Sequence, residues 1–595
     1  MAGLPPIPGD SALARLFSQE RAQGEAAWFS LPGGETLYSA GDAADQLFFL
    51  RTGRLGAFRR EGGHETQFLG VIRPGEPAGE MALVAGAPHS ADVVALRDSE
   101  IFALPRDVFF EACESDSAVM TELARLMILR TRQAAKQGTI GEPSVYGFLA
   151  MGHPGSLRGL IERLALEIGR LGYSVTCIGA EAQSAPTEWF SDVERTHDFV
   201  LYIAESGDGH WRHVVARQVD RLFRVGRGDR KPPRKEVEPP PASPLTAQQL
   251  VDLILLQPAD IARPRGSDAW VEAAQPARLF HLRRDHKPDL ERIARVLTGQ
   301  SVGLVLSGGG ARAYAHVGAV RALRERDTPI DFVAGVSMGA IIAAGVAMGW
   351  GDQEMERRIR EAFVKTSPLD DIAFPILAMT HGLKVSERLH HHFGDTDISD
   401  LWLPFFCLST NLTTGAYQLH RRGQLRRALR ASISLPGILP PATDHENVLV
   451  DGAVLKNFPA DIMRAWQLGP VVGVDVTSGR SITADDVASP SSVWRWLWSG
   501  DWRKGPPIVS VLMRSATLST GPDIAASRAA TDVLVLPDVS KIEIRDWSAY
   551  EPAVAEGYRA TLEALEKLDR PVQDLRRRAS LQEPALLSPR LASAG

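Results

Sequence analysis

The sequence predicts a multidomain protein with an N-terminal β-roll and helix, followed by two α/β units. Three observations support this fold class. The chain has 595 residues, which is too long for one hydrophobic core. Residues 25–112 contain short β-type runs separated by Gly-rich turns, and one long helical pattern follows them. From about residue 145 onward, strand and helix patterns alternate, which is typical of parallel β-α-β units.

The β-roll is predicted over residues 12–140. Its β-type composition is punctuated by Gly-Asp and Gly pairs, and the helical pattern "SAVMTELARLMILRTRQAAK" follows the last strand. The predicted strands are "ETLYSAGD", "QLFFLRTGRLGAF", "TQFLGVI" and "ADVVALRDSEIFAL". A helix of this length after a set of short strands is expected to close one side of the roll.

A central Rossmann-like domain is predicted over residues 145–298, with a mobile Pro-rich charged linker at 226–244. The strand "SVYGFLAMG" leads through a turn with Gly152 and Gly155 into an amphipathic helix. This turn resembles a P-loop, but no Gly-Lys-Ser/Thr follows, so ATP hydrolysis is not expected. The domain resembles a degenerate nucleotide-binding domain serving as a spacer or interaction surface.

The third unit is predicted over residues 301–566, and residues 567–595 are predicted to form a disordered tail because they lack periodicity. The net charge of −6 argues against a general nucleic-acid binder. The three cysteines are far apart, which fits a reducing compartment. No secretory signal is visible, so we expect a cytoplasmic protein.

The stretch "VAGVSMGAIIAAGVAMGW" allows two interpretations. It is uncharged and about as long as a membrane span, but it also places Ser337 between Gly335 and Gly339. A Gly-x-Ser-x-Gly turn between a strand and a helix is a nucleophile elbow, in which the helix N-terminus faces a developing oxyanion. Four glycines within an α/β pattern favour the elbow over a membrane span.

Two further motifs in the same unit support a nucleophilic serine. Gly308, Gly309 and Gly310 follow a strand, where they could cradle a phosphate or supply the amides of an oxyanion hole. Asp451 ends the apolar strand of "VLVDGA" and is followed by Gly452. An Asp-Gly pair is often only a turn, but a carboxylate at this position could deprotonate Ser337 directly.

Residues from about 300 to 566 resemble the patatin-like phospholipase family, and the flanking motifs resemble its neuropathy target esterase branch. The resemblance implies a patatin-like hydrolase domain in which Ser337 is the nucleophile and Asp451 the base. Gly308, Gly309 and Gly310 match the oxyanion loop, and Arg312 the arginine after it. The family motif ends in Gly where this chain has Ala313, a change of one methyl group at a helix start that is not expected to abolish activity.

The resemblance implies a serine esterase that cleaves carboxyl esters of phospholipids or lysophospholipids through an acyl-enzyme, with no cofactor and no metal. A rival mechanism uses a histidine base, with His316 and His445 as the nearest candidates in sequence. A rival function is a ligand sensor or scaffold with a vestigial hydrolase domain. The three catalytic motifs are intact, which argues against a vestigial hydrolase domain.

Residues 28–115 resemble a cyclic nucleotide-binding domain through "ETLYSAGDAADQLFFLRTGRL" and "PAGEMALVAGAPHSADVVA". The resemblance implies that Gly79 and Glu80 occupy the ribose-binding position. His89 stands where the family has its phosphate-binding arginine, and Asp92 stands where it has a small hydroxyl residue. Because a neutral imidazole grips phosphate poorly and a carboxylate repels it, cyclic nucleotides are not expected to bind.

Tryptophans gather in "SSVWRWLWSGDWRKGPP", where Arg495, Arg503 and Lys504 are interleaved with them. Tryptophan favours the membrane–water interface, and cations attract anionic headgroups. The alternative is a core segment of the third unit, which would tolerate interleaved arginines poorly. We therefore expect a peripheral contact with the inner face of a membrane, to which the basic run "HRRGQLRRALRAS" could add.

Overall fold

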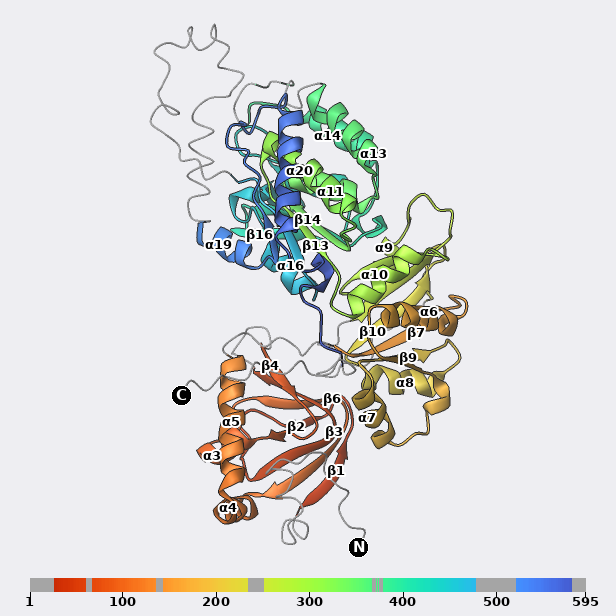
Figure 1. Cartoon of the computed structure of the whole chain (residues 1–595), viewed down its shortest axis with the longest axis vertical. Coiled ribbons are helices and arrows are strands. Elements are labelled where there is room, and N and C mark those ends of the chain that lie inside the picture. Colours follow the sequence, from red (N-terminus) through yellow and green to blue (C-terminus); the bar gives the residue numbers. More distant parts are fainter. Residues whose placement is uncertain are drawn as a thin grey trace, which may run out of the picture. The chain divides into compact units, whose positions relative to one another are not determined.

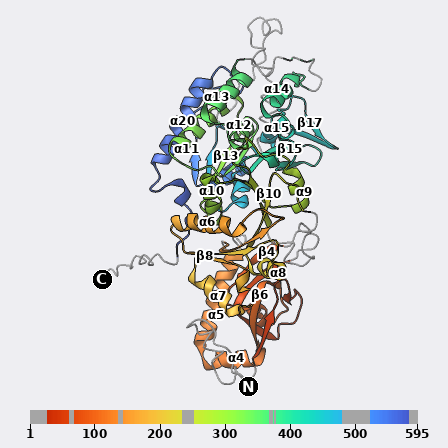
Figure 2. The ribbon, with the colours of Figure 1, turned by 90° about the vertical axis from the view of Figure 1, so that its right-hand side faces the viewer.

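The computed structural model describes residues 26–59, 67–134, 143–233, 251–365, 371, 373, 378–477 and 521–580. It divides into two compact units. The first contains the described residues up to 227 together with short later segments, and the second contains Leu255–Arg578 and a short loop before it. The predicted succession of a β-roll with helices followed by α/β sheets is confirmed (Figures 1 and 2). The domain boundaries given above stay a prediction.

The β-roll lies in the first unit. Its antiparallel sheet has the order β1-β6-β3-β4, and the short strands β2 and β5 pair with β6 and β3. Helices α4 and α5 lie beside this sheet (Figure 1) and bury Phe109 and Leu123 against Phe49 and Phe102. The bounds are β1 (Ala27–Leu31), β2 (Thr36–Tyr38), β3 (Gln46–Arg59), β4 (Gln67–Ile72), β5 (Pro77–Ala78), α3 (Glu80–Ala85), β6 (Asp92–Pro105), α4 (Arg106–Ser115) and α5 (Ser117–Ala134).

The first unit also contains the parallel strands β10-β7-β9-β8, which are consecutive in a six-stranded sheet. Strands β7 and β9 are buried along their whole length because helices flank them in sequence and cover them. The bounds are β7 (Val145–Ala150), α6 (Leu157–Arg170), β8 (Val175–Ile178), α7 (Thr187–Thr196), β9 (Phe199–Ala204), α8 (Gly209–Gln218) and β10 (Arg221–Arg227). Most of the predicted linker at 226–244 lies outside the described residues.

Buried ion pairs join the β-roll to this parallel sheet within the first unit. Arg97 of β6 pairs with Glu194 of α7, and Arg54 of β3 pairs with Asp220. The second oxygen of Asp220 accepts the amides of Ser144 and Val145 at 2.9 and 3.1 Å. Breaking a buried pair from one side leaves an uncompensated charge, so these pairs fix the roll against the sheet.

The second unit is built on the sheet β17-β18-β15-β14-β13-β19-β20, with β16 beside β15. The central strands β15, β14, β13, β19 and β20 are parallel, so their carboxyl ends share one edge. Their bounds are β13 (Gly303–Leu306), β14 (Phe332–Val336), β15 (Phe405–Asn411), β16 (Ala416–His420), β17 (Ala442–Asp444), β18 (Asn447–Asp451), β19 (Val471–Val474) and β20 (Val533–Val535).

Helices cover both faces of this sheet, and α11 lies directly against α20 (Figures 1 and 2). A Cβ atom on Gly318 of α11 would lie 1.9 Å from the carbonyl oxygen of Val554 of α20. The helices of this unit include α11 (Ala315–Glu325), α12 (Met338–Ala347), α13 (Asp352–Ile359), α14 (Leu383–Phe393), α15 (Leu425–Ser432), α16 (Ala460–Trp466), α19 (Gly521–Ala529) and α20 (Tyr550–Glu566). Two further helices, α9 (Asp268–Ala274) and α10 (Lys287–Leu297), and strands β11 (Val251–Gln257) and β12 (Leu279–Arg283) precede β13.

The segment predicted to be a tail from residue 567 is structured as far as residue 580. A 3₁₀-helix spans Val572–Asp574, in which Val572 is buried and Asp574 accepts a hydrogen bond from Gln300 at 2.7 Å. This anchoring depends on single contacts with distant residues, and such contacts leave no periodic pattern in the sequence. Residues 581–595 lie outside the described residues.

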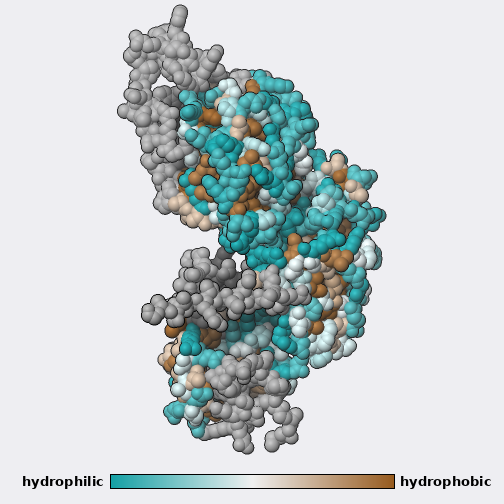
Figure 3. All heavy atoms as spheres, in the orientation of Figure 1, coloured by the Kyte–Doolittle hydropathy of each residue, from teal (hydrophilic) through white to brown (hydrophobic). Residues whose placement is uncertain are grey.

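The apolar stretch after Ser337 forms the ten-residue helix α12, and every residue of it is buried in the core of the second unit. Among the described residues, no helix combines the length and apolar character that a membrane span requires. The face of the molecule visible in Figure 3 is mostly hydrophilic, with apolar residues scattered over it. The apolar composition of α12 therefore follows from its central packing.

Candidate active site

Ser337 stands at a sharp bend between a strand and a helix. Strand β14 is fully buried and ends at Val336, and α12 begins at Met338. Ser337 itself has φ 54° and ψ −128°, a strained conformation for a residue with a side chain. Strain of this kind persists where the surrounding structure fixes it, and it is the backbone geometry of a nucleophile elbow.

The glycines on either side of Ser337 allow neighbouring backbones to approach closely. A Cβ on Gly335 would lie 2.5 Å from the carbonyl carbon of Gly339. A Cβ on Gly339 would lie 2.4 Å from the carbonyl oxygen of Ser307, directly after β13. Gly335 thus allows α12 to fold back closely on β14, and Gly339 allows α12 to approach the end of β13.

Asp451 is the hydrogen-bond partner of Ser337. The Ser337 hydroxyl donates to Asp451 Oδ2 at 2.6 Å, and Asp451 Oδ1 accepts the amide of Ala453 at 2.9 Å. Asp451 ends β18, which lies beside β15 in the sheet, and its side chain is fully buried. A Cβ on Gly452 would lie 2.5 Å from the carbonyl oxygen of Leu408, so the next residue is also closely packed.

Burial raises the pKa of Asp451 to about 6, although the hydrogen bonds from Ser337 and the Ala453 amide favour the ionised form. A carboxylate with this pKa is a stronger base than an exposed aspartate. It is also ionised at neutral pH, so it can accept a proton there.

The glycine loop lies beside the nucleophile. A Cβ on Gly308 would lie 3.1 Å from the Cβ of Ser337. The Gly308 amide donates to Asn457 Oδ1 at 3.0 Å, so it is already occupied. Gly309 and Gly310 begin a 3₁₀-helix, and the first amides of a helix lack an acceptor within that helix. The amides of Gly309 and Gly310 are therefore the candidates in this loop for contact with an oxyanion, whereas the Gly308 amide already has an acceptor.

Arg312 has a structural contact in this arrangement. Its Nε donates to the carbonyl oxygen of Ile542 at 2.6 Å, and the Ala311 amide donates to the carbonyl oxygen of Ile544 at 2.8 Å. These bonds hold the glycine loop against the segment that follows β20. Ala313, which stands where the family motif has glycine, is fully buried in the 3₁₀-helix that precedes α11.

Two residues of the site were missed in the sequence. Ser432, at the end of α15, accepts the Ser337 amide at 2.9 Å. Asn457 accepts the Gly308 amide, and its Nδ2 donates to the carbonyl oxygen of Gly308 at 3.2 Å. The only signal in the sequence was a polar residue in an apolar context, in "RASISLPG" and "VLKNFP". That signal is too common to single them out.

The two candidate histidines occupy other positions. His316 is completely buried and its Nε2 lies 2.8 Å from the carbonyl oxygen of Ser307. Burial lowers its pKa to about 4, so the imidazole is neutral. His445 has a side chain that is 93% exposed, next to Asp444. Since Ser337 Oγ donates to Asp451, the arrangement favours the carboxylate as the partner of the hydroxyl.

The second candidate site is in the β-roll, around His89, which stands where the cyclic nucleotide-binding family has its phosphate-binding arginine. His89 is 5% exposed and stacks on Tyr38 with ring centroids 3.7 Å apart. Its Cε1 would lie 3.0 Å from a Cβ on Gly79. Asp92 Oδ1 accepts the Ala40 amide at 2.8 Å. The imidazole therefore packs over Gly79, and burial lowers its pKa although Asp42 opposes this.

A carboxylate and two imidazoles lie close together elsewhere in the second unit. The ligand atoms of Glu361, His391 and His392 are within 4.8 Å of one another. Burial, helped by His391 and Arg358, lowers the pKa of His392 to about 4. Exposed groups of this kind are common on helices without an ion, and we assign no metal to them.

Comparison with known proteins agrees with this geometry. The patatin-like phospholipase family matches residues 304–464, which include Ser337 and Asp451, and the cyclic nucleotide-binding domain family matches residues 28–116. An uncharacterized NTE family protein of Mycobacterium tuberculosis is 32% identical over 553 residues, covering 90% of this chain and 91% of the relative. The chain belongs to the NTE family.

Animal members of the NTE family are longer than this chain. Patatin-like phospholipase domain-containing protein 6 of Homo sapiens is 27% identical over 89% of this chain but only 44% of its own length. Neuropathy target esterase sws of Drosophila melanogaster is 26% identical over 83% of this chain and 39% of its own length. The predicted neuropathy target esterase branch is thereby confirmed.

Among solved structures, the catabolite activator protein of Thermus thermophilus is 26% identical over 24% of this chain and 62% of its own, with a TM-score of 0.18. The patatin-like phospholipase match and the NTE relatives support a lipid hydrolase, and the match to the cyclic nucleotide-binding family precedes the patatin-like match along the chain.

Proposed function

We propose that the protein is a serine esterase that hydrolyses carboxyl esters of phospholipids or lysophospholipids and releases the fatty acid. The observation that carries the proposal is the 2.6 Å hydrogen bond from the Ser337 hydroxyl to the buried carboxylate of Asp451. In this proposal Ser337 Oγ attacks the ester carbonyl while Asp451 accepts its proton. The protonated Asp451 then gives the proton to the departing alcohol, which leaves an acyl-enzyme.

Water completes the reaction. It attacks the acyl carbonyl while Asp451 takes its proton, and the resulting tetrahedral intermediate breaks its bond to Ser337 Oγ. Asp451 returns the proton to Ser337 Oγ, and the fatty acid is released. The oxyanion of each tetrahedral intermediate would be held by the amides of Gly309 and Gly310 and by the N-terminus of α12, whose first amide belongs to Met338. Asn457 and Ser432 act as positioning residues, since they hold the backbone of Gly308 and Ser337.

A fluorophosphonate probe tests the proposal against a sensor or scaffold with a vestigial hydrolase domain. An activated elbow serine should be labelled at Ser337, and mass spectrometry of the digested protein locates the label. Fatty acid release from a panel of diacyl and lysophospholipids then identifies the substrate class. Absence of labelling in a folded protein would favour the scaffold.

The pKa of Asp451 predicts an acid limb in the rate profile. Because the base must be ionised, kcat/KM toward a neutral short-chain ester should fall about tenfold for each pH unit below about 6. An exposed aspartate would place this limb near pH 4. Steady-state rates between pH 4.5 and 8 check the prediction, and a flat profile down to about pH 4.5 would contradict it.

The stability of the folded protein should decrease over the pH range in which kcat/KM increases. The pKa of Asp451 is higher in the folded protein than in the unfolded chain, so ionisation costs folding free energy as the pH rises from about 4 through about 6. Asp451→Asn removes that cost and keeps an acceptor for the Ala453 amide. The melting temperature of this variant relative to wild type should therefore increase over that pH range.

The β-roll is proposed to have lost cyclic nucleotide binding. The neutral imidazole of His89 is stacked on Tyr38, and the Asp92 carboxylate is close to the same segment. Cyclic AMP or cyclic GMP at about 100 µM should give no shift in melting temperature, because stabilisation requires ligand well above its dissociation constant. A saturable shift with either nucleotide would overturn this proposal.

A peripheral contact with a membrane is proposed from the sequence alone, because Trp494, Trp496, Trp498 and Trp502 lie outside the described residues. Replacing all four with alanine should lower hydrolysis of vesicle phospholipid at least about tenfold, since interfacial binding is lost. Cleavage of a water-soluble short-chain ester should be nearly unchanged. Equal losses on both substrates would mean that these tryptophans belong to the core.

A further inference from the structure

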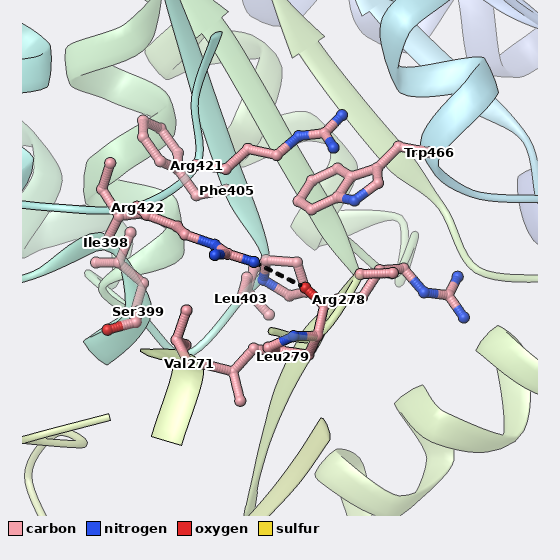
Figure 4. A pocket seen from close by; sticks show the side chains of 14 residues that line it. Val271, Arg278, Leu279, Ile398, Ser399, Leu403, Phe405, Arg421, Arg422 and Trp466 are labelled. Carbon is pink, nitrogen blue, oxygen red and sulfur yellow. Dashed lines mark hydrogen bonds between the residues drawn. The ribbon is translucent and has the colours of Figure 1, made fainter. Parts of the chain in front are cut away.

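A pocket of about 250 Å³ lies in the second unit, away from the proposed active site. Its lining includes Phe405 at the first residue of β15, Trp466 at the end of α16, and Arg421 and Arg422 directly after β16 (Figure 4). Phe405 pairs with Val333 at the start of β14, four residues before Ser337. At about 3.3 Å per residue, the pocket and the nucleophile are about 13 Å apart along the strand.

The polar groups of this pocket are almost all hydrogen-bond donors. The polar side chains are those of Arg278, Arg421, Arg422, Trp466 and Ser399, and no aspartate or glutamate is among the described residues that line the pocket. Arg278 places its guanidinium over Phe280 and Phe332, with Cζ 5.4 and 5.9 Å from the ring centroids. The side chains that remain to bind a ligand are thus Arg421 and Arg422.

Arg421 is held in the pocket by aromatic rings. Its Cζ lies 4.8 Å from the Trp466 ring centroid and 5.8 Å from that of Phe406. Its Nε and the Nε1 of Trp466 are buried and have no hydrogen-bond partner among the residues that the structure describes. A buried donor without a partner is costly, so these two favour an acceptor that the described residues do not supply.

Arg422 also lines the pocket, and it is exposed to solvent. Its guanidinium donates to Gln275 Oε1 at 2.6 Å and to the carbonyl oxygen of Pro276 at 3.1 Å (Figure 4), two neutral acceptors. Within the described part of the chain, neither Arg421 nor Arg422 is within salt-bridge distance of a carboxylate. Burial and the charge of Arg422 together lower the pKa of Arg421. Two neighbouring positive charges therefore lack a counterion.

We propose that this pocket binds a small phosphomonoester. A phosphomonoester carries about −1.5 to −2 charges at pH 7 and has three acceptor oxygens, which match two guanidinium groups and the free donors beside them. Guanidinium also binds phosphate in a fixed bidentate geometry. The opposite wall, which includes Val271, Leu279 and Leu403, would contact the carbon part of the ester. The volume excludes a large ligand.

Calorimetric titration of the full chain with sn-glycerol 3-phosphate tests the proposal, with inorganic phosphate and glycerol as separate titrants. We expect saturable binding of the ester with a dissociation constant below about 1 mM. Inorganic phosphate should bind more weakly, and glycerol should not bind. Arg421→Gln with Arg422→Gln should weaken binding at least about tenfold, as loss of charge-assisted hydrogen bonds predicts.

The matched control is Arg426→Gln with Arg427→Gln, which removes the same charge from adjacent residues of α15 outside the pocket. It should bind like wild type. Trp466→Phe keeps an aromatic ring at this position and removes the unpaired Nε1–H, so it should weaken binding several-fold without unfolding the chain. Fluorophosphonate labelling of Ser337 in every variant reports the fold and tests the esterase separately.

Three results would overturn the proposal. The first is the absence of saturable binding by the ester. The second is equal weakening in the control variant, which would indicate attraction by net charge alone. The third is binding of inorganic phosphate without binding of the ester, which would indicate a simple anion site.

Discussion

Ser337→Ala and Asp451→Asn should each lower kcat/KM toward a short-chain ester by at least about a thousandfold. The serine variant has no nucleophile. In the wild type, the Ser337 hydroxyl donates a hydrogen bond to Asp451 at 2.6 Å. The asparagine variant keeps the shape of the side chain but cannot take the proton from Ser337. Because both residues act in one step, the double variant should be no slower than either single variant.

Two histidine variants serve as controls for the dyad. His445→Ala changes an exposed turn and should leave kcat/KM within about twofold of wild type. His316→Ala opens a cavity beside the buried carbonyl of Ser307, so it should lower the melting temperature and reduce kcat/KM far less than Asp451→Asn. Wild-type turnover by a folded Asp451→Asn variant would eliminate the dyad mechanism.

The sequence was informative about the site where the chemistry depends on local spacing. The elbow could be predicted because Gly335, Ser337 and Gly339 alternate within five consecutive residues at the junction of a strand pattern and a helix pattern. Asp451 could be predicted because it ends an apolar strand and precedes a glycine. The motifs indicate only that Asp451 could act on Ser337, and the resemblance to a known family assigns the pairing across the 114 residues that separate the two.

Contacts between distant residues of ordinary type could not be predicted. Asn457 holds Gly308 across 149 residues, and Ser432 holds the Ser337 amide across 95. Serine and asparagine are common, and the sequence does not indicate which of them is buried against a loop. The ion pair between Arg97 and Glu194 was invisible for the same reason, because arginine and glutamate are usually exposed.

The difference between local spacing and tertiary contacts also applies to the pocket lined by Arg421 and Arg422. Arg421 and Arg422 occur in a basic run, "HRRGQLRRALRAS", that suggested at most an attraction to anionic headgroups. Folding separates the run. Arg421 and Arg422 line a pocket with Trp466, whereas Arg426 pairs with Asp395 on the surface. Which arginines lack a counterion is decided by tertiary structure.

Gly339→Ala should reduce kcat/KM at least about a hundredfold and also lower stability. The added methyl group would lie 2.4 Å from the carbonyl oxygen of Ser307 and 2.6 Å from that of Leu306, which are backbone atoms at the end of β13 and directly after it. Helix α12 must therefore move away from β13 and carry Ser337 with it. A misplacement of about 1 Å can cost about a hundredfold in rate, and overpacking typically costs about 1–3 kcal/mol of folding free energy.

The matched control for this substitution is Gly169→Ala. Gly169 also lies within a helix, α6, but it is exposed, and a Cβ there would meet no atom within 4 Å. Alanine favours a helix over glycine by about 1 kcal/mol, so this variant should melt at or above the wild-type temperature with unchanged kcat/KM. Thermal melts and ester hydrolysis on the two variants in parallel separate the loss of helix flexibility from the steric effect. If Gly339→Ala also kept wild-type turnover, close packing of α12 against β13 would not be what positions Ser337.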